Sequence, residues 1–228
     1  MTIAARILQV RDQIARACAL VDRDPGGVEL LPVSKRHSAE AILEAQASGV
    51  RMFGENRVQE LASKARDLAG ASVAWHMIGS LQTNKVQQVV EIAGLVLIQT
   101  MDRVKLADAL QLAAFRQGVD IDVLVQVNAT GEEQKHGATP LEAPALLAHL
   151  MKDCPNLRPV GLMAMGPLHG DPSGVFEQVA EARESLRQTA GLPLPILSMG
   201  MTGDMEAAIA AGSTMVRVGT GVFGPRPS

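Results

Sequence analysis

The chain has 228 residues, of which 47% are hydrophobic and 20% charged, a composition typical of a globular protein with a sizeable core. Its formal net charge of −3 offers no basic surface to nucleic acid or an anionic membrane, and aromatic side chains, which stack on bases, make up only 2% of the residues. We therefore expect neither a nucleic-acid nor a membrane partner.

The N-terminal residues and the cysteines point to an intracellular protein. The first residues run into a helical pattern interrupted by charges, so we expect neither a signal peptide nor a membrane span. Cys18 and Cys154 lack metal-ligand spacing and the histidines do not cluster in the sequence, so we expect reduced cysteines and no metal site. A cytoplasmic monomer is the expectation.

Helical and strand patterns alternate along the chain. Residues 3–22 have apolar side chains at helical spacing, and Pro25 begins the turn that ends this segment. Short β-rich runs predict eight strands, at residues 28–34, 50–54, 73–79, 95–100, 121–128, 157–165, 195–199 and 215–219. Amphipathic stretches predict helices between them, at 38–48, 55–69, 83–92, 102–117, 140–152, 172–189 and 203–211. Expected N-caps are Ser38, Asp102 and Thr139, the last followed by Pro140.

This alternation predicts an α/β fold, namely a single (β/α)8 TIM barrel with an additional N-terminal helix. No linker or low-complexity tract divides the chain, so we expect one domain over residues 1–228. An open doubly wound sheet is the alternative. Its dinucleotide-binding version is disfavoured, because no Gly-x-Gly-x-x-Gly turn follows the first strand.

Residues suited to chemistry follow the predicted strands, where barrels place their active sites. Lys35 ends the apolar run of the first strand, a position that packing explains poorly. Hydroxyl and glycine residues follow the last two strands, at 198–203 and 219–221. Their backbone N–H groups could bind a phosphate, as barrels often do after strands seven and eight, although ordinary tight turns have the same composition.

An amine facing a phosphate site suits pyridoxal phosphate, which forms a Schiff base with a lysine and is anchored separately by its phosphate. Arg217, in the last strand, could face the pyridine nitrogen, which would then stay unprotonated and make the ring a weaker electron sink. A barrel-end ion pair is the alternative for Arg217.

Other polar and methionine residues near the strand ends have two interpretations each. Asn56 and Asn128 could orient a ring hydroxyl or bond their own loops, and His76 is either a core histidine or a catalytic base. Lys85 and Lys135 could bind an anion, although solvated lysines are commoner. We expect Trp75 to pack in the core, and the methionine pairs to fill the barrel, at Met163, Met165, Met199 and Met201.

Several long motifs, spread from about residue 28 to 226, resemble the YggS/PROSC family of pyridoxal phosphate homeostasis proteins. They lie at residues 33–35, 53–60, 75–85, 161–165, 197–205 and 212–220. The resemblance implies a barrel similar to the amino-terminal domain of alanine racemase, with pyridoxal phosphate held by Lys35 as an internal aldimine. It also implies phosphate-binding positions at Ser198, Gly219 and Thr220, with Arg217 at the pyridine nitrogen and Asn56 near the cofactor.

The resemblance further implies a carrier or regulator that balances free pyridoxal phosphate and, indirectly, amino-acid pools, without robust catalysis. Apo forms of pyridoxal phosphate-dependent enzymes are its implied partners. Two departures from the family pattern are Arg36, where threonine is frequent, and the tail at 225–228, which lacks the usual aromatic end.

Catalysis on amino acids, of the racemase type, is the alternative function. It needs a proton donor on each face of the substrate, and the chain contains no tyrosine to act as the second base. Lys35 would form the Schiff base in such an enzyme, with His76 or another group as proton donor. A pure protein-interaction scaffold, a third possibility, would form no Schiff base.

Overall fold

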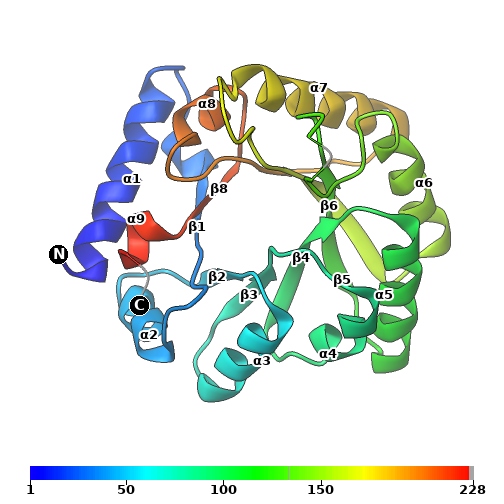
Figure 1. Cartoon of the computed structure of the whole chain (residues 1–228), viewed down its shortest axis with the longest axis horizontal. Coiled ribbons are helices and arrows are strands. Elements are labelled where there is room, and N and C mark those ends of the chain that lie inside the picture. The colour runs from blue at the N-terminus through cyan, green and yellow to red at the C-terminus, as the bar shows by residue number, and fades with distance from the viewer. Residues whose placement is uncertain (133, 226–228) are drawn as a thin grey trace.

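Eight parallel strands form a barrel surrounded by helices in the computed structural model, which describes residues 1–132 and 134–225 (Figure 1). The strands follow the order β1-β8-β7-β6-β5-β4-β3-β2, and a parallel bridge between Val33 and Gly54 joins the two ends of this row. The predicted TIM barrel is confirmed, and the open sheet is wrong. The strands are β1 (Glu29–Pro32), β2 (Met52–Glu55), β3 (Ala74–Met77), β4 (Leu95–Met101), β5 (Ile121–Val127), β6 (Leu157–Ala164), β7 (Ile196–Ser198) and β8 (Met215–Val218).

Each of the eight predicted helices is present in the described residues, with shifted ends. They are α1 (Ile3–Ala19), α2 (Ala39–Ala47), α3 (Val58–Asp67), α4 (Val86–Val90), α5 (Val104–Gln117), α6 (Ala143–Asp153), α7 (Ser173–Ala190) and α8 (Met205–Ala210). The stretch expected at 83–92 begins with a 3-10 turn, η2 (Thr83–Lys85), and another, η1 (Pro25–Gly27), follows α1. A short helix that the sequence pattern did not predict, α9 (Thr220–Phe223), follows β8 directly.

The predicted N-caps have mixed outcomes. Ser38 is confirmed, since its hydroxyl accepts a hydrogen bond from the backbone N–H of Ala41. The prediction of Asp102 as an N-cap is wrong, because the helix begins one residue later and the Asp102 carboxylate pairs with the Arg103 side chain instead. Thr139 exchanges hydrogen bonds with Glu142 as in a capping box, but a turn intervenes and α6 starts only at Ala143.

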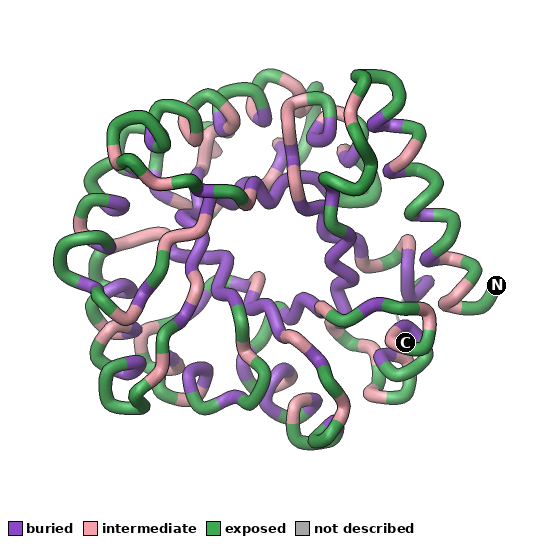
Figure 2. Tube along the Cα trace, turned by 180° about the vertical axis from the view of Figure 1, so that it is seen from behind, coloured by how far each residue is buried: buried purple, intermediate pink, exposed green. Residues whose placement is uncertain are grey.

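Apolar side chains pack on both sides of the barrel wall, and Figure 2 shows buried residues along the inner ring of strands with exposed ones on the outer helices. Inside, Met163 packs with Leu97 and Leu124, and partly buried Met165 lies against them, as predicted. Trp75 packs in the larger core cluster, which also confirms that prediction. Met199 belongs to that cluster too and follows Ser198, whose side chain points inward, so it packs outside the barrel. Met201 is 43% exposed. The prediction that Met199 and Met201 fill the barrel is therefore wrong.

Two further observations concern the composition-based expectations. Cys18 and Cys154 are both buried free thiols, as expected. Within the described ranges, no helix is both long and apolar enough to cross a membrane. Of the C-terminal tail at 225–228, which departs from the family pattern, residues 226–228 lie outside the described residues.

Candidate functional site at the carboxyl ends of the strands

The predicted site residues gather at one end of the barrel, because the carboxyl ends of parallel strands share one face. Lys35 follows β1, Asn56 follows β2, and Ser198 ends β7. Gly219 follows β8, which pairs directly with β1 along Glu29–Pro32. A Cβ atom placed on Gly219 would lie 3.5 Å from the Val33 carbonyl oxygen, so the turn after β8 runs beside the segment that leads to Lys35.

A buried charge network supports the segment that carries Lys35, which is itself partly buried. The Lys64 ammonium donates to the Glu55 carboxylate at 2.6 Å, to the Ser34 carbonyl at 2.7 Å and to the Glu60 carboxylate at 2.8 Å. The Ser34 hydroxyl donates to the same Glu55 oxygen at 2.6 Å. The residue before Lys35 is therefore fixed through both its carbonyl and its side chain.

Burial sets the electrostatics of this network. It raises the pKa of the Glu55 carboxyl above its ordinary value, although Lys64 and Ser34 act in the opposite direction. Burial also acts to raise the pKa of Glu60, but hydrogen bonds from Lys64 and from the Arg36 backbone N–H outweigh it and lower that pKa. Arg36 itself has a φ of 64°, so the backbone reverses sharply just after Lys35.

Neither Glu55 nor Lys64 was predicted as part of the site. The signal for Lys64 is its helical spacing: it lies three residues after Leu61 and six after Val58, both on the buried face of α3. A lysine on an apolar helix face needs a buried partner, and the sequence alone did not identify Glu55 as that partner.

A second polar chain crosses the interior of the barrel. Arg217 donates to the Ser198 carbonyl at 2.7 Å, to the Ser198 hydroxyl at 2.8 Å and to the Ala164 carbonyl at 2.8 Å. The Ser198 hydroxyl donates to the Gln99 side chain at 2.7 Å, and Gln99 contacts His76 Nδ1 at 3.0 Å. Burial lowers the pKa of Arg217 to about 10, with Asp204 acting in the opposite direction, so the guanidinium remains charged at neutral pH.

This chain of hydrogen bonds bears on two of the open interpretations. His76 is 2% exposed and hydrogen-bonded, and burial lowers its pKa to about 4, which confirms the core histidine. The ion-pair alternative for Arg217 is not observed within the described part of the chain, where its contacts are carbonyl and hydroxyl oxygens. These contacts use three of the five N–H groups of the guanidinium.

Backbone N–H groups at the start of a short helix follow β8. Gly219 is the residue before α9, and the first N–H groups of a helix have no partner within the helix. Such groups, together with the Thr220 hydroxyl, form a donor set that suits a phosphate. After β7, Gly200 has a φ of 92°, and a Cβ atom there would lie 2.6 Å from that of Ala208, so this turn requires glycine.

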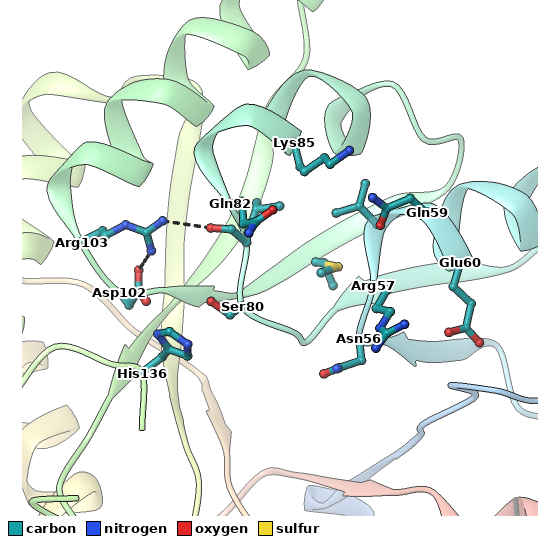
Figure 3. A pocket seen from close by; sticks show the side chains of 13 residues that line it. Asn56, Arg57, Gln59, Glu60, Ser80, Gln82, Lys85, Asp102, Arg103 and His136 are labelled. Carbon is teal, nitrogen blue, oxygen red and sulfur yellow. Dashed lines mark hydrogen bonds and ion pairs between the residues drawn. The ribbon is translucent and has the colours of Figure 1, made fainter. Parts of the chain in front are cut away.

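A pocket of about 1,040 Å³ opens at the same face, over the ends of β2, β3 and β4 (Figure 3). A smaller hollow of about 170 Å³, lined by Lys35 and Arg36, shares Asn56, Arg57 and Glu60 with it. The two hollows are therefore neighbours, and Lys35 lines the smaller one. Ser198, Arg217, Gly219 and Thr220 are not among the lining residues of either, so the sequence-predicted residues fall into two groups, one at these hollows and one around the ends of β7 and β8.

The contacts of the loop after β5 distinguish between the two interpretations of Asn128 and of Lys135. The Asn128 side chain donates to the carbonyls of Glu132 and Lys135 and accepts from Thr130, which favours the loop-bonding interpretation. The Lys135 ammonium donates to the Gly166 carbonyl at 2.7 Å and pairs with Glu132 at 2.9 Å, and its side chain is only 10% exposed. The interpretation of Lys135 as a solvated lysine is therefore wrong. Its side chain connects the loop after β5 to the loop after β6. Lys85 lines the pocket.

Comparison with known proteins places these observations in context. The family of the alanine racemase N-terminal domain matches residues 9–227. The pyridoxal phosphate homeostasis protein of Aquifex aeolicus is 39% identical, with 99% of each chain covered. The protein of that name from Pseudomonas aeruginosa is 41% identical, over 99% of this chain and 96% of that one. The human one is 37% identical, over 98% and 86%.

Solved structures agree with this picture. PipY of Synechococcus elongatus with pyridoxal phosphate bound is 35% identical and has a TM-score of 0.85, with 98% of this chain and 100% of that one covered. D-threonine aldolase from Filomicrobium marinum has a TM-score of 0.76 at 16% identity, over 99% of this chain and 62% of that one. The latter likeness shows the shared barrel fold alone.

Proposed function

The chain belongs to the family of pyridoxal phosphate homeostasis proteins, and on this premise we propose that it binds pyridoxal phosphate through Lys35 and helps to keep the cofactor in balance. Relatives that carry this name cover nearly the whole chain at close to 40% identity. PipY, at 35% identity, has been solved with pyridoxal phosphate bound. The single observation that carries the proposal is the position of Lys35 just after β1, which pairs with β8, the strand that the phosphate-suited N–H groups follow.

Lys35 would hold the cofactor as a Schiff base, and the residues after β8 would bind its phosphate. The donor set at Gly219 and Thr220 fits a phosphate without a further cation. Ser198 would contribute to phosphate binding through its position at the end of β7, since its hydroxyl is already hydrogen-bonded to Gln99 and Arg217. This arrangement separates the covalent attachment from the phosphate anchor.

Two residues would contact the cofactor ring. Arg217 keeps two N–H groups beyond its bonds to Ser198 and Ala164, and a guanidinium at the pyridine nitrogen would keep that nitrogen unprotonated. Asn56, at the junction of the two hollows, is the other candidate. The buried Gln126 Oε1 has no hydrogen-bond partner among the described residues, and such an acceptor fits a polar group brought by a bound molecule.

The site favours holding the cofactor over using it in catalysis. The chain has no tyrosine, and the low pKa of His76 and its bond to Gln99 leave it neutral within the core. The relatives are named for homeostasis and not for a reaction. A cytoplasmic location, a monomeric state and transfer of cofactor to apo-enzymes complete the proposal and remain predictions.

The visible absorption of the reconstituted protein tests the proposal. The wild type should gain a visible band on addition of pyridoxal phosphate and keep it through gel filtration. Lys35→Ala should lose this band, whereas Lys152→Ala, a change on the outer helix α6, should keep it. A wild type that cannot be reconstituted would refute the proposal, and rapid exchange of the α-proton of added alanine would favour the racemase-like enzyme.

A further inference from the structure

The larger pocket beside Lys35 has a charge balance unlike that of the chain as a whole. Arg57, Lys85 and Arg103 line it together with only two carboxylates, those of Glu60 and Asp102, while the chain carries a formal net charge of −3. Asp102 pairs with Arg103, and Glu60 pairs with the buried Lys64. The pocket therefore has an excess of positive charge on an acidic protein.

That excess resides on Lys85 and Arg57. Lys85 has no ion-pair or hydrogen-bond partner for its ammonium within residues 1–132 and 134–225. Arg57 forms no close ion pair in the same part of the chain, although its charge lowers the pKa of Glu60 at longer range. A cation at the wall of a concave pocket attracts an anion, and Figure 3 shows both residues among those surrounding the cavity.

Neutral hydrogen-bonding groups surround the two cations. The side chains of Gln59, Ser80 and Gln82 line the pocket without side-chain hydrogen bonds to any described residue. Amides supply both donors and acceptors, so they match a small polar molecule and not only a bare ion. The volume of about 1,040 Å³ is ample for a molecule of amino-acid size.

We propose that this pocket binds the carboxylate of a small, amino-acid-sized molecule beside Lys35, with Lys85 and Arg57 as its cationic anchors. The inference rests on the proposed function, because the position of the pocket near Lys35 matters only if Lys35 holds the cofactor. A planar carboxylate matches the fork of an arginine. The cofactor phosphate, held by the residues after β8, would occupy a separate anion site.

Binding of L-alanine and of L-lactate to the cofactor-free protein, measured by calorimetry, tests this inference. The two probes have a similar carboxylate and size, and lactate lacks the amine that could react with an aldehyde. Both should bind saturably, and Lys85→Gln and Arg57→Gln should each raise the Kd by about tenfold or more, since either removes a charge-assisted contact. Lys152→Gln, a change on the outer face of α6, should leave the Kd unchanged.

Control measurements separate this inference from the proposed function. Lys35→Ala should lose the cofactor band and still bind lactate, because the anchors lie outside the Schiff base. Thermal unfolding of each variant verifies that it is folded. Absence of saturable binding by either carboxylate, in a wild type that takes up the cofactor, would overturn the inference alone. Inorganic phosphate binding as tightly as lactate, with the same dependence on Lys85, would overturn the carboxylate assignment.

Discussion

Removal of the Lys64 ammonium provides a sensitive test of the buried network beneath Lys35. In Lys64→Met the stem of the side chain is retained, but Glu55, which is 0% exposed, loses its cationic partner. Breaking a buried ion pair by removing one partner costs about 3–5 kcal/mol, because the remaining charge stays buried. For a chain of this size, that cost corresponds to a fall in melting temperature of roughly 6–20 °C.

The effect should depend on pH in a defined direction. Burial raises the pKa of Glu55 in the folded protein, so the folded state holds this proton more tightly than the unfolded chain does. The contribution of Glu55 to stability is therefore greatest at low pH and falls as the pH rises above the ordinary carboxyl range. Loss of Lys64 raises this pKa further and extends the fall to higher pH.

Urea denaturation at about pH 5 and about pH 8 measures both effects. We expect Lys64→Met to lose more stability at the higher pH, and Glu55→Gln in the same chain to restore part of the loss. Lys152→Met, a change at an exposed lysine of α6, is the matched control. A loss below about 0.5 kcal/mol, or one independent of pH, would refute the argument that Lys64 neutralises a buried carboxylate.

Three further predictions concern the barrel interior and the mouth. Ser198→Ala should cost about 1–3 kcal/mol in urea denaturation, because the buried Gln99 oxygen loses its donor and Arg217 loses one of its three acceptors, and an unchanged midpoint would contradict this. Gly200→Ala should destabilise by about 1–3 kcal/mol through its positive φ and its clash with Ala208, whereas Gly203→Ala, which meets open space, should not. Wild-type stability should fall as the pH drops from about 6.5 towards 4, because the folded protein holds His76 neutral; His76→Gln should flatten this fall.

The barrel and the face that carries the site were predictable from the sequence because both follow from alternation. Short β-rich runs between amphipathic stretches predict parallel strands joined by helices. The carboxyl ends of such strands all lie at one face of the barrel. Lys35 stood out because an ammonium at the end of an apolar run is costly unless something uses it. These inferences need only local patterns.

Contacts between distant segments were not predictable in the same way. Glu55 and Lys64 meet because β2 and α3 pack together, and Asp108 approaches His149 and Cys154 because α5 packs beside α6. The inward direction of the Ser198 hydroxyl depends on Gln99, nearly a hundred residues earlier in the chain. Such pairs are set by tertiary packing, which a single sequence does not display.

Short-range details were missed for a different reason. The helix α9 has four residues and is separated from β8 by Gly219 alone, so it has too few positions to show a helical period. Asp102 has the residue type of an N-cap, but its carboxylate pairs with the neighbouring Arg103 instead. Local propensity gives way in both cases to contacts made by the folded chain.

The attachment point of the cofactor tests the central proposal most directly. Reduction of the reconstituted protein with borohydride, followed by peptide mass mapping, fixes a Schiff base to the lysine that formed it. We predict one modified lysine, Lys35, and no modification in Lys35→Ala. A modified Lys85 or Lys135 with an unmodified Lys35, or no modified lysine at all, would contradict the proposal.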